Sequence, residues 1–277
     1  MSLLYNPETK QLLDKVTTID MPHALLLEGP VGVGLSTIAR DLAWHDLAGL
    51  IQGTDNENNV DISSKGVIRI SQIRDLIEST RGKLTKRRVY VIDEADKMSI
   101  QAQNAFLKLL EEPNRFVSFI MTSHAPQKLL PTIISRVQRI HIKPIDQASS
   151  RNLIKNKGVN DEHKQAQLLF LAGGLPAELS RLINDEKLFT ERSTYAADAR
   201  TFIQGTPYQK AMIAQKYHGD RASALEMLTV AQQILRHSLS SNPSPSIVRL
   251  SDQLADAYDR ILANGNIRLQ LINLVLQ

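Results

Sequence analysis

The first half of the chain contains four short runs of consecutive apolar residues, separated by longer stretches in which apolar positions recur at helical spacing. A run without polar positions predicts a strand buried on both faces, and such strands belong to parallel sheets covered by helices. The pattern therefore predicts an α/β domain built on a parallel sheet. The predicted strands are 24–27, 89–92, 117–121 and 137–142, with 66–70 as a candidate for a further short strand.

Capping residues and prolines mark where the predicted helices begin. Asn6 and Pro7 open the first helix, and Ser71 and Ser99 are N-cap candidates further along the chain. Ser71 precedes a helix with apolar residues on one face. The other predicted helices of this domain cover 7–16, before the first strand, and 99–112 and 131–136, between later strands.

The segment 36–52 is predicted to form one continuous helix. Its apolar residues recur at helical spacing and are expected to face a core. Trp44, on the same segment, is expected to pack inside the protein. The apolar positions are Ile38, Leu42, Leu47 and Leu50.

Strand signals stop beyond Pro144, and the remaining chain is predicted to be helical, with breaks at 205–207 and 240–245. Domain boundaries are therefore expected near Pro144 and Gly205. They divide the chain into an α/β domain at 1–144 and two helical domains at 145–204 and 205–277.

The chain has 277 residues, a formal net charge of +4 and no cysteine. The absence of cysteine excludes disulfides, thiolate zinc sites and a cysteine nucleophile. A mild positive charge allows a nucleic-acid partner without requiring one. There is no apolar run as long as a membrane span and no signal-peptide pattern, which predicts a cytoplasmic protein without a membrane partner.

A glycine-rich turn lies between the first predicted strand and the next helix. This context binds phosphates, because glycines let successive backbone N–H groups point into one concavity and the helix N-terminus adds partial positive charge. The lysine of the usual pattern, which should precede the hydroxyl residues, is replaced by leucine. The candidate nucleotide-binding residues are Gly29, Gly32, Gly34, Leu35, Ser36 and Thr37.

The second predicted strand of the domain ends in two acidic residues, Asp93 and Glu94. Nucleotide hydrolases use such a pair to hold magnesium, here through Asp93, and to activate water, here through Glu94. An acidic pair after a strand is also an ordinary solvated strand end. The glycine loop upstream favours the nucleotide-site interpretation.

Further segments carry a family resemblance. They are Ile70-Ser-Gln-Ile-Arg-Asp-Leu, Gln103-Asn-Ala-Phe-Leu-Lys-Leu-Leu-Glu-Glu-Pro, Leu129-Leu-Pro-Thr-Ile-Ile-Ser-Arg136 and Gly173-Gly-Leu-Pro. Together with the loop and the acidic pair, they make residues 1–185 resemble the AAA+ ATPases and, within them, the clamp-loader subunits of replicative DNA polymerase. The run that begins at Gln103 is the most specific. The helical tail fits the family's collar by composition and position.

The resemblance implies a layout and a set of partners. Residues 1–144 correspond to the ATPase-like domain, 145–204 to a helical lid, and 205–277 to a collar that joins five subunits around primed DNA. The implied partners are clamp-loader ATPase subunits and a delta-type subunit. The resemblance also implies an indirect contact with the sliding clamp and a contact with the phosphate backbone of primed DNA.

Ser135-Arg136 matches the Ser-Arg motif of that family. Its arginine acts in trans, on the γ-phosphate bound by the neighbouring subunit. Such a finger accelerates hydrolysis roughly a thousand-fold or more, because it meets charge that develops in the transition state. Judged from the residues alone, the alternative is that Arg136 pairs with a local carboxylate.

Two cations that the family places at the phosphate site are missing. Leu35 stands where the loop lysine is expected, and Pro176 where the lid arginine is expected. Their loss implies a subunit of the delta-prime type, a rigid member that does not hydrolyse ATP and presents its finger to an ATPase neighbour. No cofactor is expected, although weak binding of ATP with magnesium stays open. Thr122 and Ser123 match the family's polar sensor position.

Family members of this type carry a four-cysteine zinc module where 53–64 stands here without cysteine, so no zinc is expected. Arg69 and Arg74 lie at and beyond the start of the segment 70–77, an element that faces the DNA chamber in related loaders, and are candidates for backbone contact. A basic cluster, at Lys83, Lys86, Arg87 and Arg88, is either a further DNA contact or a solvated loop.

Two other functions stay open. One is an active ATPase of the gamma type with an unusual loop, which needs a cation from Lys97, Lys108 or Arg181. The other is an AAA+-like scaffold that acts outside the replisome.

Overall fold

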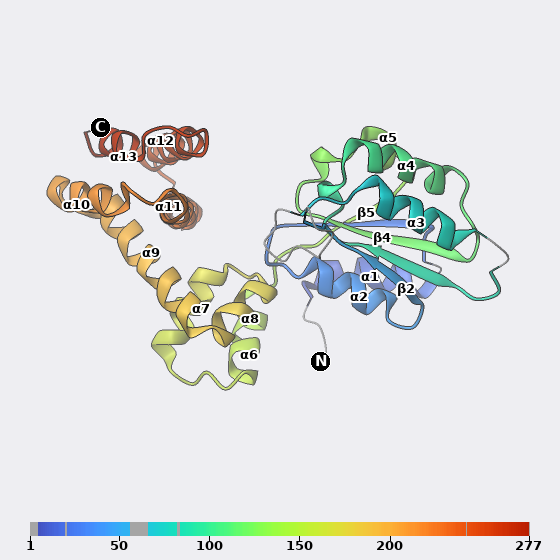
Figure 1. Ribbon diagram of the computed structural model, residues 1–277. Helices are drawn as coiled ribbons and strands as arrows, with labels where there is room; N and C mark the ends of the chain where they lie inside the picture. The colour runs from blue at the N-terminus through green and yellow to red at the C-terminus, as the bar shows by residue number, and fades with distance from the viewer. Residues whose placement is uncertain (1–4, 20, 56–65, 82–83, 242, 277) are drawn as a thin grey trace. The chain divides into compact units, whose positions relative to one another are not determined.

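The structure is a computed structural model (Figure 1) that describes residues 5–19, 21–55, 66–81, 84–241 and 243–276. Contacts divide the chain into two compact units. The first comprises Met1–Asn160 with Ala172–Ser180, and the second comprises Asp161–Leu171 with Arg181–Gln277. The division into three domains at 1–144, 145–204 and 205–277 stays a prediction.

A parallel sheet of five strands, in the order β2-β3-β4-β1-β5, forms the centre of the first unit. This confirms the predicted α/β fold class. Each of the four apolar runs that predicted a strand forms one, and β2 is an addition. The strands are β1 (Ala24–Glu28), β2 (Leu47–Ile51), β3 (Arg88–Ile92), β4 (Val117–Ser123) and β5 (Gln138–His141).

Helices cover both faces of the sheet (Figure 1). Each face of the sheet packs against its own hydrophobic core. Alternate residues of β1 belong to the two cores, with Leu25 and Leu27 on one face and Ala24 and Leu26 on the other. This explains why the strand is a continuous apolar run. The first face is covered by α1 (Pro7–Ile19) and α2 (Leu35–Ala43), the second by α3 (Ile70–Thr80), α4 (Ile100–Glu111) and α5 (Pro131–Ile134), and α6 (Gln147–Asn156) follows β5.

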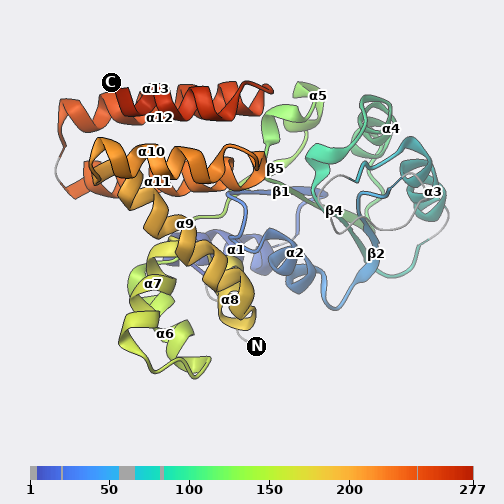
Figure 2. The same ribbon diagram turned by 60° about the vertical axis from the view of Figure 1, so that its left-hand side comes forward.

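The second unit is helical, as predicted. Its core contains Tyr195, Phe202, Met227, Leu254 and Leu271, and Figure 2 shows α12 and α13 lying over α10 and α11. No helix in the described part of the chain is both long and apolar enough to span a membrane. The last seven helices of the chain are α7 (Glu162–Ala172), α8 (Pro176–Asn184), α9 (Glu186–Gln204), α10 (Pro207–Tyr217), α11 (Arg221–Ser241), α12 (Pro245–Leu262) and α13 (Ile267–Leu276).

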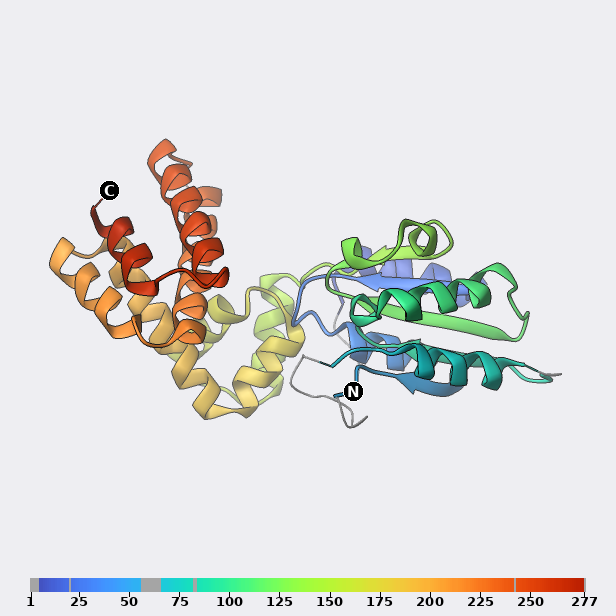
Figure 3. The same cartoon turned by 45° about the horizontal axis from the view of Figure 1, so that its top comes forward.

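The prediction of one helix over 36–52 is wrong, because α2 ends at Ala43 and β2 follows as an edge strand (Figure 3). A β-bulge between Leu47 and Gly49 shifts the register. Leu47 then pairs with Val89 and Leu50 with Val91, so two leucines three residues apart share one face of the sheet. Their spacing therefore imitates a helix.

Trp44 is also placed differently from the prediction. It is the C-cap of α2 and is 75% exposed rather than part of the core. Leu47 and Leu50 are 44% and 39% exposed, so the end of the predicted helix does not face a core either.

The segment before α3 differs in detail from the prediction. The predicted strand at 66–70 does not form. Only isolated bridges occur there, Thr54 with Val67 and Ile68 with Met98, and Ile70 already belongs to α3. α3 begins one residue before Ser71, and its N-cap is Arg69, whose backbone N–H donates to Gln72 Oε1 at 2.9 Å. The predicted cap of α4 is confirmed, since Ser99 Oγ accepts from the backbone N–H of Ala102.

We expect Phe106→Ala to lower the free energy of unfolding of the first unit by about 3–5 kcal/mol, because it leaves a cavity in the core. Phe106 is fully buried on α4, with its ring centroid 5.2 Å from that of Phe119. Ile100→Ser, on the exposed side of the same helix, should change it by less than about 0.5 kcal/mol. Denaturant titration measures both, and equal losses would contradict the assigned core.

Candidate nucleotide-binding site

The glycine-rich loop leads from the carboxyl end of β1 into α2. Gly32 and Gly34 have φ angles of 88° and 97°, in the left-handed region that favours glycine. A Cβ at Gly29 would lie 2.8 Å from the carbonyl oxygen of Ile142. The path of the backbone thus requires glycine at all three positions.

Leu35, at the position of the usual lysine, is 1% exposed. Its side chain belongs to the apolar cluster on the α2 side of the sheet, with Leu27, Ile38 and Ile142, and Leu175 packs against the same cluster. The space beneath the loop is therefore filled by apolar packing and contributes no positive charge to a phosphate.

The first turn of α8 is hydrogen-bonded to the glycine-rich loop. The carbonyl oxygen of Gly32 accepts hydrogen bonds from the backbone N–H groups of Ala177 at 2.9 Å and Glu178 at 3.2 Å. Free N–H groups in the first turn of a helix attract anions. Here two of them are taken up by the loop itself, and the residue before them is Pro176, which has no N–H and no cationic side chain.

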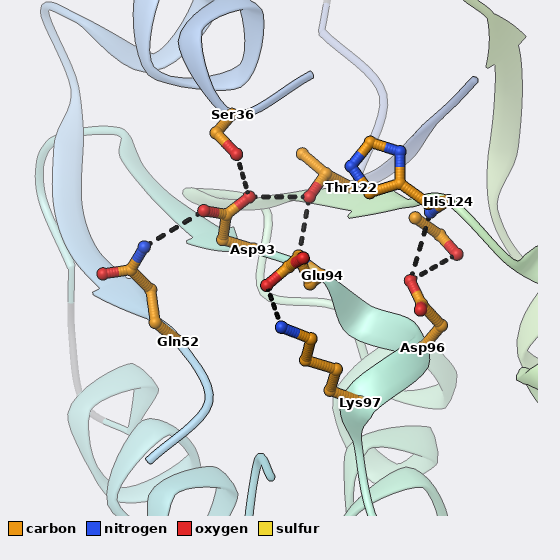
Figure 4. Close-up of polar contacts among 9 residues, drawn as sticks. Ser36, Gln52, Asp93, Glu94, Asp96, Lys97, Thr122 and His124 are labelled. Carbon is orange, nitrogen blue, oxygen red and sulfur yellow. Dashed lines mark hydrogen bonds and ion pairs between the residues drawn. The ribbon is translucent and has the colours of Figure 1, made fainter. Parts of the chain in front are cut away.

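Asp93 lies at the carboxyl end of β3 and is 6% exposed (Figure 4). Its carboxylate accepts three hydrogen bonds, from Ser36 Oγ at 2.6 Å, Thr122 Oγ1 at 2.8 Å and Gln52 Nε2 at 3.1 Å. The sequence prediction brought Ser36, Asp93 and Thr122 into one site but missed Gln52. Thr37, beside Ser36, is exposed.

Glu94 follows Asp93 with a φ of 54°, which is uncommon for a residue other than glycine. Its backbone N–H donates to Thr122 Oγ1 at 2.8 Å. Its carboxylate pairs with Lys97. A base that activates water must be free to accept a proton, and here the carboxylate is engaged by an ammonium group three residues away.

The other predicted sensor residue, Ser123, is fully buried at the end of β4. Its hydroxyl donates to Asp96 Oδ1 at 2.8 Å, and Asp96 also accepts from the backbone N–H of His124 at 3.2 Å. The His124 ring is hydrogen-bonded to the carbonyl oxygen of Gly29 at 2.8 Å. These bonds fix the end of β4 to the glycine loop. Nothing in the sequence singled out Asp96 or His124.

The residues fit one half of a magnesium–nucleotide site. Ser36 and Asp93 are the hydroxyl and carboxylate types that share magnesium in P-loop proteins, and they are adjacent. Two of the three candidate cations are engaged or placed elsewhere in the described part of the chain. Lys97 pairs with Glu94, and Lys108 lines a separate cavity with Thr80. Within the described ranges, no group of three or more His, Cys, Asp or Glu side chains could hold a metal ion.

Arg136 follows the last turn of α5 and is 38% exposed. Its guanidinium lies 3.2 Å from Glu111 Oε1, at the end of α4, and donates to the carbonyl oxygen of Thr132 at 3.1 Å. In the isolated chain it therefore pairs with a local carboxylate, one of the two interpretations of the sequence. Sequence reasoning missed Glu111 as its partner.

The candidate DNA contacts differ from one another. Arg69 is held by its own chain, since Nη1 donates to Thr54 Oγ1 at 3.0 Å and to the carbonyl oxygen of Asp55 at 2.6 Å. Arg74 is exposed on α3. Lys83 lies outside the described residues. So do residues 56–65, which form most of the segment that stands where family members carry a zinc module.

Comparison with known proteins decides the family. A family model described as DNA polymerase III, delta subunit, matches residues 5–146, more than half of the chain. The chain belongs to this family of clamp-loader subunits. It is 35% identical over 183 residues to the DNA polymerase III delta-prime subunit of Pseudomonas aeruginosa, covering 58% of this chain and 55% of that protein.

Other clamp-loader proteins are nearly as similar. The tau subunit of Escherichia coli is 32% identical over 158 residues, 51% of this chain and 24% of that protein. The matched part thus spans about half the length of the delta-prime relative and less of tau. A point mutant of RuvB from Thermotoga maritima has a TM-score of 0.51 at 13% identity, covering 94% of this chain and 88% of that one, which shows the AAA+ fold alone.

We expect Leu35→Lys to lower the free energy of unfolding by at least about 2 kcal/mol, because it places an ammonium group in an apolar cluster. Leu35→Met, which keeps volume and polarity, should cost less than about 1.5 kcal/mol. Denaturant titration of the two variants gives the comparison. Equal stability would mean that the side chain at this position reaches an open, polar phosphate site.

Proposed function

We propose that the chain is a non-hydrolysing clamp-loader subunit of the delta-prime type, which assembles with ATPase subunits and a delta-type subunit to load the sliding clamp on primed DNA. One observation carries the proposal: the side chain at the loop-lysine position is a buried leucine. Loss of one charge-assisted hydrogen bond to a phosphate weakens nucleotide binding by roughly 1.5–3 kcal/mol. The loss of stabilisation is larger in the transition state of hydrolysis, because more negative charge develops there.

The contact between α8 and the loop supports the same function. Gly32 is bonded to Ala177 and Glu178 by the chain's own backbone. A loop satisfied in this way needs no phosphate to order it. We infer a subunit whose lid segment 172–180 holds the loop shut, in keeping with a rigid role in an assembly.

The role of Arg136 in trans is part of the proposal. Its pair with Glu111 joins two side chains that are 38% and 52% exposed, and exposed ion pairs contribute only about 0–1 kcal/mol. The guanidinium can therefore leave Glu111 at little cost and turn to a phosphate on a neighbouring subunit, where bidentate bonds from arginine are favoured.

Assembly through the C-terminal helices has its own support. Tyr208 and Met212 are 75% and 53% exposed and lie one turn apart on α10, and Leu262 and Leu269 are 58% and 56% exposed near the turn between α12 and α13. Exposed apolar groups of this kind favour subunit contacts. We propose that 205–277 is the collar.

A second candidate is an active ATPase of the gamma type. The adjacency of Ser36 and Asp93 favours it, because this half of the site keeps the groups that would hold magnesium. Turnover by the isolated chain would support this candidate, which would then need a phosphate-binding cation from Lys97, Lys108 or Arg181.

The purified chain alone should show no magnesium-dependent ATP turnover. In an assembly reconstituted with the ATPase and delta-type subunits of its own clamp loader, Arg136→Ala should slow turnover at the neighbouring site roughly a thousand-fold, because the transition state loses its finger. Arg136→Lys should rescue little, since an ammonium lacks the planar fork. Arg115→Ala, a matched change at an exposed arginine, should leave turnover unchanged. Unchanged ATP turnover by the assembly with Arg136→Ala would contradict the proposed role of Arg136 as an arginine finger in trans.

A further inference from the structure

Three apolar side chains form an exposed patch at the edge of the sheet, which we call the β2 edge patch. It consists of Trp44, Leu47 and Leu50, which are 75%, 44% and 39% exposed. The two leucines lie on the α2 side of β2, because their partners Val89 and Val91 both belong to the core on that side. Trp44 is the C-cap of α2, three residues before Leu47 in the chain. The bulge at Ala48 thus turns both leucines to the side where the tryptophan lies.

A basic groove adjoins the patch at Leu47. It has a volume of about 570 Å³ and is lined by residues 45–48 and 84–88. Lys86 and Arg88 are exposed and pair with no carboxylate in the part of the chain that the structure describes. Arg87 lines the groove too, and its guanidinium lies 3.4 Å from the carbonyl oxygen of Met21. Asp46 is the acidic residue of the lining.

We propose that the β2 edge patch and this groove form a docking site for an acidic segment of a partner protein that carries apolar side chains. Trp and Arg are the residues most often found at the energetic centre of protein interfaces. The apolar side chains of the segment cover Trp44, Leu47 and Leu50, and its carboxylates meet Lys86 and Arg88. Charge complementarity of this kind steers association and selects the partner.

Other occupants fit less well. A second copy of the chain, paired through the same face in a two-fold dimer, would bring a second basic groove against the first, which is repulsive. A strand added to the free edge of β2 would meet the bulge between Leu47 and Gly49, where the register is broken. Single-stranded nucleic acid binds on several aromatic platforms, whereas this patch offers one aromatic ring and two aliphatic side chains, with Asp46 nearby.

The first test selects peptides from a random-sequence phage library on the full chain and discards those that also bind Trp44→Ser/Arg88→Glu. The enriched sequences should combine Asp or Glu with Leu, Phe or other apolar residues. A basic or uncharged consensus, or no enrichment of peptides that depend on the patch, would overturn the proposal. The result does not depend on the proposed clamp-loader function, because it needs neither the assembly nor ATP.

The second test measures the affinity of one enriched peptide. Trp44 is the sole tryptophan of the chain, so its fluorescence should shift to the blue when the peptide covers it. Lys86→Glu/Arg88→Glu should weaken binding at least roughly tenfold, as should Trp44→Ser when measured by calorimetry. The matched controls Ile100→Ser and Lys155→Glu should not. Added salt should weaken binding by the wild-type chain.

The remaining outcomes all count against the proposal. They are peptide binding that persists in the variants, tighter patch-dependent binding of a single-stranded oligonucleotide, and self-association of the chain that is lost in Trp44→Ser. Because the substituted side chains are exposed, the variants should keep the thermal unfolding midpoint of the wild type within a few degrees. That measurement separates lost binding from lost folding.

Discussion

The glycine-rich loop of this chain is held in shape by apolar packing beneath it and by a helix end above it. Leu35 fills the space under the loop, and two N–H groups of α8 bond to the carbonyl oxygen of Gly32. In a hydrolase the same loop is completed by a charged ligand, which brings order only when bound. Here protein groups provide that order permanently, so the loop and the residues 172–180 above it behave as one structural element.

Asp93 also has a structural task that does not require magnesium. The carboxylate of Asp93 joins α2 through Ser36, β4 through Thr122 and the segment after β2 through Gln52. A buried carboxylate without such partners would be costly, so the hydroxyl and amide donors are needed as long as the acid is present. These bonds give Asp93 a structural role beside a loop that carries leucine at the usual lysine position.

The sequence was sufficient for much of the fold and for three of the residues that lie together in the candidate site, Ser36, Asp93 and Thr122. Continuous apolar runs predicted β1, β3, β4 and β5, and the missing lysine was visible directly. β2 was missed because its bulge gives Leu47 and Leu50 a helical spacing, which a period alone cannot distinguish. The bond between Gly32 and the start of α8 could not be predicted, since it joins segments far apart in the chain and uses backbone atoms that carry no sequence signal. The Arg136–Glu111 pair escaped for a similar reason, because it depends on how α4 and α5 pack.

Calorimetric titration of the purified chain with ATP and magnesium tests the central claim most directly, because it measures the phosphate site before any chemistry. The account predicts no saturable, magnesium-dependent binding in the micromolar range, since Leu35 contributes no charge and α8 occupies the loop. Micromolar binding that disappears when magnesium is removed would contradict it.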